Sequence, residues 1–244
     1  MTIKKNAPRL VSLFSGCGGM DKGFDLAGYR RVWANDFDKD AQAVFRLNLG
    51  EIDTRNICIV PVEEIPDCDI ITAGFPCQPF SNAGNRKGVY DERGGLYLEC
   101  LRIIEEKKPR AVVFENVKGL LSSKHQNGEK LIDVIKGDLE KIGYDVEYKV
   151  VNASDYGVPQ NRERMILVAL RNDLGKKFVF PPVVTDKSKL TLQHTIFDIP
   201  KDAPNQKSWP LSPQALSMVE QIPEGGSWKA IPYENLSPRF QRIR

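Results

Sequence analysis

Short apolar runs alternate with stretches of helical spacing through the first two thirds of the chain. The apolar runs predict strands at residues 9–14, 31–35, 69–73 and 111–114. Apolar residues at helical spacing predict helices through Leu26, over 38–47, through Leu96, Cys100 and Ile104, and over 131–142, the last ended by Gly143. This alternation predicts an α/β fold with a doubly wound, mostly parallel sheet that binds ligands at the carboxyl ends of its strands.

The last part of the chain has a different pattern. Apolar runs at 145–151 and 165–170 have no helical stretch between them, so they predict a late antiparallel hairpin. Beyond Phe180 the periodicity weakens, and nine of the chain's 16 prolines lie between Pro181 and Pro238. The pattern therefore predicts one domain over 1–180 and a proline-rich, partly irregular extension over 181–244.

Composition argues against several classes of protein but does not identify the function. A formal charge of +3 is too small an excess to indicate nucleic-acid binding by itself. No apolar run is long enough to span a bilayer and the start of the chain lacks the apolar core of a signal peptide, so we expect a cytoplasmic protein with no membrane partner. The five cysteines are never spaced C-x-x-C and only two histidines are present, so we expect neither a metal site nor a disulfide framework.

The first candidate site is the glycine-rich turn Phe14-Ser15-Gly16-Cys17-Gly18-Gly19, between a predicted strand and a predicted helix. Glycines allow close approach of the backbone to a ligand. A dinucleotide-binding turn would carry glycine at position 21, where Asp21 stands, so a ligand with a positive centre and no phosphate, such as S-adenosylmethionine, fits better. Asp36 could accept hydrogen bonds from a ribose and Phe37 could face an adenine; the alternative is a tight turn followed by a helix-capping Asp36.

The second candidate site is Gly74-Phe75-Pro76-Cys77-Gln78-Pro79-Phe80-Ser81, directly after the third strand. A cysteine in a proline-braced loop at a strand's carboxyl end is placed as a nucleophile would be. A cysteine taken alone is more often a small buried apolar residue. We expect that simpler role for the other four, which are Cys17, Cys58, Cys68 and Cys100.

Two further segments carry charged groups toward the same edge of the sheet. Glu115 and Asn116 stand at the end of the fourth strand, close to where Cys77 is expected, although a solvated glutamate at a strand end is the simpler interpretation. Arg162 and Arg164 stand two residues apart, so in extended chain both would point toward one anionic or carbonyl ligand. A solvated charged turn is the alternative for this pair.

With these four blocks in order, residues 9–171 resemble the DNA cytosine-5 methyltransferase family of bacterial restriction-modification systems. FSGCGG is similar to its cofactor loop, GFPCQPFS to its catalytic loop, ENV to its glutamate motif and QNRER to its arginine motif. The resemblance implies a class I, Rossmann-like methyltransferase fold, S-adenosylmethionine as cofactor and double-stranded DNA as partner. The domain over 1–180 would then bind the cofactor and perform catalysis.

The resemblance also implies roles for particular residues. The target cytosine would be flipped out of the duplex, Cys77 would attack its carbon 6 and Glu115 would bond ring nitrogen 3. Arg164 would hold the base carbonyl, with Arg162 and Asn116 supporting the loop. The implied cofactor-binding residues are Phe14, Gly16, Gly18, Gly19, Asp36, Phe37, Asn56, Ile57, Pro76 and Leu96.

Some positions depart from the family's commonest pattern. Asp36 stands where glutamate is frequent, Phe37 where tryptophan is frequent, and Asn56 where an aspartate usually accepts a bond from the adenine amine. The loop over 81–95 has the small and charged residues of a segment that closes over DNA, although a solvated loop is equally compatible with it. The candidate DNA contacts are Gln78, Ser81, Arg86, Lys87 and Arg93.

Family members continue into a target-recognition region and a final helix, and nothing after Pro181 resembles either. We therefore expect either a shortened chain or a natural subunit whose second polypeptide supplies them. An RNA-directed relative is disfavoured because no cysteine here is followed by Phe-Thr. A non-catalytic member would be expected to have lost Cys77 or Glu115, and an oxidoreductase is disfavoured by Asp21 at the glycine turn.

Overall fold

The structure is a computed structural model that describes most of the chain. The described residues are 6–76, 96–124, 128–183, 186, 188, 190–197, 199–200, 202–204 and 208–242. They form two compact units, Met1–Thr195 and Ile196–Arg244. This division falls later in the chain than the boundary predicted at residue 180, and the roles assigned to the two parts remain predictions.

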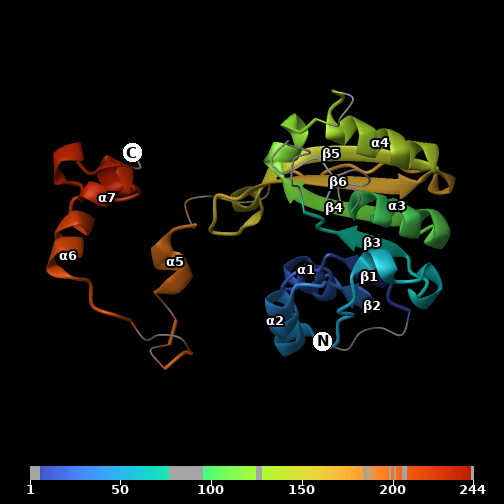
Figure 1. Ribbon diagram of the computed structural model, residues 1–244, viewed down its shortest axis with the longest axis horizontal. Helices are drawn as coiled ribbons and strands as arrows, with labels where there is room; N and C mark the ends of the chain where they lie inside the picture. The colour runs from blue at the N-terminus through green and yellow to red at the C-terminus, as the bar shows by residue number, and fades with distance from the viewer. Residues whose placement is uncertain are drawn as a thin grey trace, which may run out of the picture. The chain divides into compact units, whose positions relative to one another are not determined.

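A six-stranded sheet organises the first unit, and its order, β2-β1-β3-β4-β6-β5, can be followed in Figure 1. Neighbouring strands among β1 to β4 pair in parallel, whereas β6 runs antiparallel to both β4 and β5. The predicted doubly wound sheet with a late antiparallel hairpin is therefore confirmed. The strands are β1 (Arg9–Leu13), β2 (Arg30–Asn35), β3 (Ile70–Ala73), β4 (Ala111–Val117), β5 (Tyr144–Asn152) and β6 (Glu163–Arg171).

Four helices connect these strands, close to where the apolar periodicity predicted them. Asp38 caps the second helix by accepting a hydrogen bond from the Ala41 N–H at 2.8 Å, and Gly143 follows the fourth with φ of +94°. Asp38 therefore stabilises the start of its helix, and Gly143 allows the backbone to leave the end of its helix at a positive φ that is unfavourable for other residues. The helices are α1 (Gly19–Leu26), α2 (Lys39–Leu49), α3 (Leu96–Lys107) and α4 (Leu131–Lys141). Short 3-10 turns are η1 (Ile57–Ile59), η2 (Val62–Glu64), η3 (Lys118–Ser122), η4 (Ala153–Tyr156) and η5 (Asn172–Leu174).

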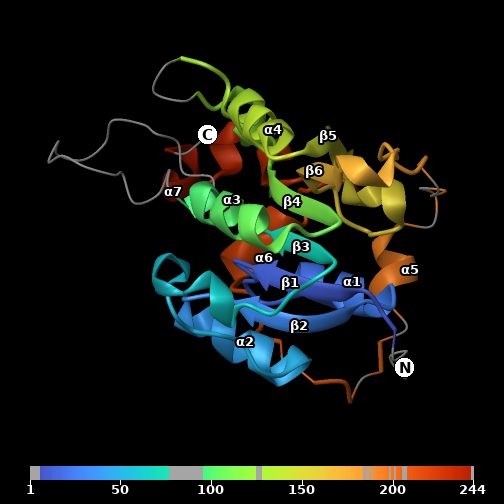
Figure 2. The ribbon, with the colours of Figure 1, turned by 90° about the vertical axis from the view of Figure 1, so that its right-hand side faces the viewer.

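The two faces of the sheet are covered by different helices. Helices α3 and α4 lie side by side (Figures 1 and 2) and contribute to the main apolar core with alternate residues of the strands. Fully buried members of this core include Leu13, Ile71, Phe114, Leu167, Ile103 and Ile135. On the opposite face, Phe45 of α2 packs with Ala34 of β2, and Asp21 of α1 is hydrogen-bonded to Ser12 of β1.

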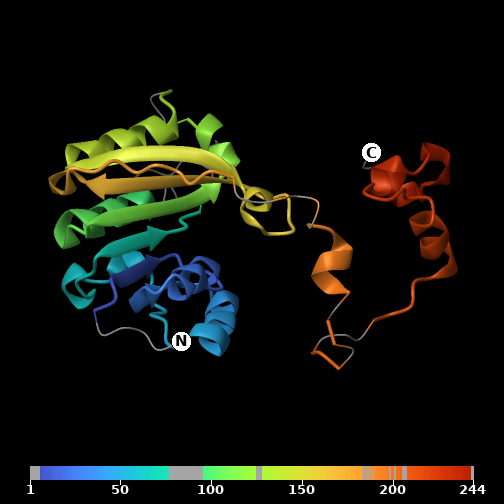
Figure 3. The same ribbon diagram turned by 180° about the vertical axis from the view of Figure 1, so that it is seen from behind.

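The antiparallel strand β6 extends β4 beyond its predicted end. Residues Glu115, Asn116 and Val117 pair with Ile166, Met165 and Arg164, so they form the end of β4, beyond the apolar run that closes at Phe114. Figure 3 shows β4, β6 and β5 next to one another from the opposite side. Because β6 runs against β4, the beginning of β6 lies at the same edge of the sheet as the carboxyl end of β4.

The second unit consists of short helices with a small apolar cluster. Ile231 and Leu236 are buried in it, and the rings of Trp228 and Phe240 lie 5.3 Å apart between centroids. The weak periodicity of this part of the sequence did not indicate such a cluster. Its elements are α6 (Pro213–Val219), η7 (Trp228–Ala230), η8 (Tyr233–Asn235) and α7 (Pro238–Gln241), while α5 (Leu192–Ile196) crosses the division. Within the described ranges, the structure has no helix with the length and apolar character needed to traverse a bilayer.

Candidate functional site

The glycine-rich turn between β1 and α1 has an unusual backbone. Phe14 has φ of +52° and Gly16 has φ of +55°, and Gly18 caps α1 with φ of +83°. A residue other than glycine is strained at such a positive φ, in the left-handed region. Strained residues of this kind are often found at ligand sites, where the surrounding structure holds them in place. The Ser15 N–H donates to the Asn35 carbonyl oxygen at 3.0 Å, which ties the turn to the end of β2.

The glycines of this turn serve two different purposes. A Cβ at Gly18 would lie 2.1 Å from Leu49 Cδ1, so this glycine is required for packing against α2. A Cβ at Gly16 or Gly19 would meet no atom within 4 Å, so these two leave open space beside the backbone. Open space over two glycines at a strand's carboxyl end is the cradle that a cofactor needs.

The Asp36 carboxylate lies beside this cradle. Its Oδ2 accepts a hydrogen bond from the Gly16 N–H at 2.7 Å, and its Oδ1 accepts one from the Asp38 N–H at 2.9 Å. Asp38, not Asp36, caps α2, so the alternative interpretation of Asp36 as a helix cap is wrong. The next side chain, Phe37, is 62% exposed, which is unusual for a phenylalanine and leaves a ring face available to a planar ligand.

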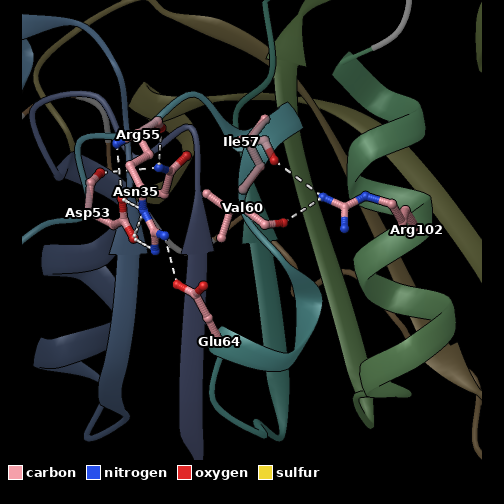
Figure 4. Close-up of polar contacts among 7 residues, drawn as sticks. All are labelled: Asn35, Asp53, Arg55, Ile57, Val60, Glu64 and Arg102. Atoms are coloured by element: carbon pink, nitrogen blue, oxygen red, sulfur yellow. Dashed lines mark hydrogen bonds and ion pairs between the residues drawn. The ribbon is translucent and has the colours of Figure 1, made fainter.

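A charged turn at Asp53 and Arg55, drawn in Figure 4, lies next to Asp36, because the Asp36 N–H donates to the Asp53 carbonyl oxygen at 3.1 Å. We call this turn and the residues that continue it, Asn56 and Ile57, the wall. Arg55 binds Asp53 at 2.6 Å and Glu64 at 2.7 Å, and the Asn35 amide donates to the carbonyl oxygens of Asp53 and Arg55. The hydrogen bond from Arg55 lowers the pKa of Asp53. These contacts fix the chain immediately before Asn56.

Asn56 and Ile57 continue this wall. The Asn56 Oδ1 accepts a hydrogen bond from the Cys58 N–H at 3.0 Å, so the oxygen that was expected to face an adenine amine already has one partner. Ile57 is buried, and its carbonyl oxygen and that of Val60 each accept a hydrogen bond from Arg102 of α3 at 3.2 Å (Figure 4). Arg102 thereby ties the wall to the helix that begins at Leu96.

A second group of polar residues lies where β4 and β6 meet. The Arg164 Nε lies 2.9 Å from the Glu115 Oε1, and both side chains are partly exposed. Glu115 also lies near the end of β3, because a Cβ at Gly74 would be 3.8 Å from its Oε2 and 3.6 Å from the Phe14 carbonyl oxygen. The structure thus brings the glutamate and arginine motifs together beside the glycine turn.

Asn116 ties this group to the segment after β3. Its buried Nδ2 donates to the Phe75 carbonyl oxygen at 2.9 Å, and its Oδ1 accepts from the Val117 N–H at 2.9 Å. Phe75 is itself anchored, since its ring packs edge-on against Phe114 at 5.2 Å. Pro76 follows it and is exposed.

The two arginines of the fourth motif differ in their surroundings. Arg164 is paired with Glu115, whereas Arg162 is exposed and is fixed through its backbone, which donates to Asn152 Oδ1 and accepts from the Ala153 N–H. The remaining predicted site residues lie outside the described part of the chain. These are Cys77, Gln78, Ser81, Arg86, Lys87 and Arg93.

Two expectations from the sequence need correction, and two supporting residues were missed. Cys17 and Cys58 are exposed rather than buried, because both stand in turns at the carboxyl edge of the sheet, whereas Cys68 and Cys100 are buried as expected. Asp21 does not face the ligand side of the glycine turn, because its side chain is fully buried and bonded to Ser12. Arg55 and Arg102 support the site and were missed, since an arginine in a turn or on a helix carries no local sign of its partner.

Comparison with known proteins agrees with this arrangement. Type II methyltransferase M.NgoFVII of Neisseria gonorrhoeae is 42% identical over 245 residues, which cover 96% of this chain and 65% of that protein. M.HhaI of Haemophilus parahaemolyticus is 44% identical over 174 residues, covering 71% of this chain and 52% of that protein. The chain therefore spans about half to two thirds of the length of these relatives.

Solved structures share the fold. The S. pombe Dnmt2 methyltransferase matches 71% of this chain and 53% of its own, with a TM-score of 0.60 and 27% identity. A Spodoptera frugiperda DNMT2 structure matches 72% of this chain and 53% of its own, with the same TM-score and 26% identity. The family model described as C-5 cytosine-specific DNA methylase matches residues 8–242. The chain belongs to the C-5 cytosine-specific DNA methylase family.

Proposed function

We propose that this chain provides the catalytic and cofactor-binding part of an enzyme that methylates carbon 5 of cytosine in duplex DNA. The observation that carries the proposal is the meeting of Glu115, Arg164 and Asn116 beside the end of β3, from which the segment bearing Cys77 continues. Relatives named Type II methyltransferases support a role in a bacterial restriction-modification system.

The glycine turn fits S-adenosylmethionine. The open space at Gly16 and Gly19 would accommodate it, Asp36 would hold its ribose hydroxyls and the exposed Phe37 ring would lie against its adenine. The wall formed by Asn56 and Ile57, together with Leu96, would complete the adenine side, and Phe14 and Pro76 the inner side. When bound there, S-adenosylmethionine supplies the methyl group.

The remaining chemistry falls to side chains of this chain. A stacked cytosine presents its carbon 6 to no protein group, so the base must leave the duplex. The Cys77 thiolate would then bond to carbon 6 as the double bond to carbon 5 opens, a step helped by nearby positive charge because only the thiolate is nucleophilic. Carbon 5 would take the methyl group and then lose its proton, and this elimination would restore the double bond and release Cys77 as thiolate. Glu115 would share a proton with ring nitrogen 3 and stabilise the charge that develops in the ring.

The arginine and asparagine would position these groups. Arg164, whose Nε lies 2.9 Å from the Glu115 Oε1, would orient that carboxylate and hold the base carbonyl, and Arg162, two residues before it, would support the loop. Asn116 would hold the loop by its bond to Phe75, two residues before Cys77. Gln78, Ser81, Arg86, Lys87 and Arg93 remain predicted DNA contacts, and the need for a second polypeptide also remains a prediction.

A trapping experiment tests the proposal. A duplex with 5-fluorocytosine at candidate target sites should form a covalent adduct with the chain in the presence of S-adenosylmethionine and a polypeptide that supplies the recognition region, because fluorine blocks the final elimination. The assay should be run with and without a polypeptide that carries a family recognition region. Cys77→Ala should abolish the adduct and Cys58→Ala, which removes an exposed cysteine in a turn, should retain it. An adduct formed by Cys77→Ala would contradict the proposed nucleophile.

A further inference from the structure

Asp21 is a fully buried carboxylate to which the proposed mechanism gives no role. It lies in the first turn of α1 and accepts a hydrogen bond from the Ser12 hydroxyl at 3.0 Å. Ser12 in turn accepts one from the Ser15 hydroxyl at 2.8 Å, and Ser15 also lies 3.2 Å from the Ser12 carbonyl oxygen. A chain of hydrogen bonds therefore runs from the glycine turn to Asp21.

The ionised Asp21 carboxylate fixes which group donates in each of these hydrogen bonds. A carboxylate can only accept hydrogen bonds, so the Ser12 hydroxyl hydrogen must point at Asp21. The Ser12 oxygen is then left to accept from Ser15. Ser15 is held from both sides, because its N–H also donates to the Asn35 carbonyl oxygen at 3.0 Å.

The glycine turn has a conformation that needs such support. Ser15 lies between Phe14, with φ of +52°, and Gly16, with φ of +55°. A phenylalanine in the left-handed region is unfavourable and persists only where the surrounding structure holds it. The bonds of Ser15 act on the peptide unit directly after this strained residue.

Asp21 is poorly explained as a purely stabilising ion pair. The Arg31 Nε lies 3.7 Å from Asp21 Oδ1, too far for a hydrogen bond, and Arg31 also approaches Asp25 at 3.7 Å. Among the described residues, Asp21 Oδ1 and Arg31 Nη1 are buried without a hydrogen-bond partner. Burial raises the pKa of Asp21 to about 6, so the charge is kept at a cost to folding.

We propose that Asp21 is a positioning residue for the cofactor: through Ser12 and Ser15 it holds the backbone from Phe14 to Gly16 in the shape that binds S-adenosylmethionine. The inference rests on the proposed function, because it assumes that this turn binds that cofactor. Asp36 accepts a hydrogen bond from the Gly16 N–H, and Asp21 acts on Ser15 through Ser12. Two carboxylates therefore support neighbouring residues of the turn.

Calorimetric binding of S-adenosylhomocysteine to the full chain tests the inference. Ser12→Ala and Ser15→Ala should each weaken binding about 5-fold, the effect of losing one ordinary hydrogen bond. Ser12→Ala also leaves the buried Asp21 carboxylate without its donor, so it should lower the melting temperature as well. Thr72→Val is the matched control. Thr72 pairs with Ser12 in the β1–β3 register, is equally buried, and has a hydroxyl without a hydrogen-bond partner among the described residues, so this variant should bind as the wild type does.

The pH dependence separates positioning from a general loss of packing. The affinity of the wild type for S-adenosylhomocysteine should fall as the pH is lowered through about 6. Protonated Asp21 can itself donate a hydrogen bond, so the Ser12 hydroxyl is no longer held in one orientation. Asp21→Asn should lack this step. The charged groups that face Asp21 are Arg31 and Asp25, and the Asp36 carboxylate lies at Gly16. All three are present in both proteins, so only the change at position 21 distinguishes them.

The outcomes are distinguishable. Wild-type affinity in both Ser12→Ala and Ser15→Ala, or an unchanged pH step in Asp21→Asn, would overturn the inference and leave the proposed function intact. A wild-type chain that binds no S-adenosylhomocysteine would overturn the proposed function together with the inference. Weaker binding by the two serine variants, with normal binding by Thr72→Val, would support it.

Discussion

Replacing Asn116 with alanine should destabilise the first unit, chiefly by removing the donor to the buried Phe75 carbonyl oxygen, since Val117, which loses the other bond, is exposed. The Asn116 side chain is 4% exposed and its Nδ2 donates to the Phe75 carbonyl oxygen at 2.9 Å. Phe75 is 5% exposed, so water cannot readily replace the lost donor. A buried polar group left without a partner costs about 1–3 kcal/mol, which corresponds to roughly a 5- to 150-fold change in the unfolding equilibrium.

The size of this effect can be measured by thermal and urea unfolding. For a unit of this size, each kcal/mol lowers the melting temperature by about 2–4 °C, so Asn116→Ala should melt roughly 2–12 °C below the wild type. Asn48→Ala is the matched control, because Asn48 also donates to a backbone carbonyl, that of Val44 at 2.8 Å, but on the exposed surface of α2. That variant should remain within about 0.5 kcal/mol of the wild type.

The same substitution should affect catalysis more than cofactor binding, because Phe75 lies two residues before Cys77 and outside the glycine turn. Turnover of Asn116→Ala in a methyl-transfer assay should fall while its affinity for S-adenosylhomocysteine stays near that of the wild type. Equal melting temperatures for Asn116→Ala and Asn48→Ala would refute the reasoning. They would show that the Phe75 carbonyl finds another partner.

Three further predictions follow from the site. Glu115→Gln should reduce turnover on the order of 100-fold or more with cofactor affinity nearly intact in calorimetry, and a large loss of that affinity would instead place Glu115 in the cofactor site. Asp36→Ala should reduce the binding free energy of S-adenosylhomocysteine by about 1–3 kcal/mol, because it leaves ribose hydroxyls unpaired. Unchanged affinity would show that Asp36 does not bind the ribose. Asp21 has a folded pKa of about 6 against an ordinary 3.8, so its contribution to stability is full below about pH 4 and is lost as the pH rises through 6. Asp21→Asn should therefore gain stability relative to the wild type across that range, by at most roughly 3 kcal/mol in urea titrations, and a pH-independent difference would contradict the raised pKa.

Local pattern was sufficient for most of the fold. The alternation of apolar runs and helical spacing predicted β1 to β4 and α1 to α4, and the missing helix before residue 165 predicted the hairpin of β5 and β6. The apolar run indicated β4 only as far as Phe114, because an apolar run records burial, whereas the polar end of this strand is held by pairing with β6. Such pairing joins segments about fifty residues apart and leaves no local trace.

The site was predictable as a set of motifs but not as a set of contacts. The sequence placed Glu115 and Arg164 at one edge of the sheet, yet their ion pair depends on the register of two distant strands. The hydrogen bonds from Arg102 to the carbonyl oxygens of Ile57 and Val60 depend on how α3 lies against η1. The spacing of residues along the sequence does not predict this packing. Asp21 was predicted to influence the ligand side of the turn, but the rotation of α1 directs it into the interior.

The antiparallel register of β4 and β6 also determines where this chain can change in length. Val117 pairs with Arg164, and successive residues of a strand point to opposite faces, so inserting one residue between Arg164 and Ile166 would turn the guanidinium away from Glu115. A residue inserted in the exposed turn at 157–161 would lengthen the hairpin loop and leave that register as it is. Tolerance to insertions therefore changes abruptly within a few residues, and a scan of single insertions through 157–168 would locate the boundary at the start of β6.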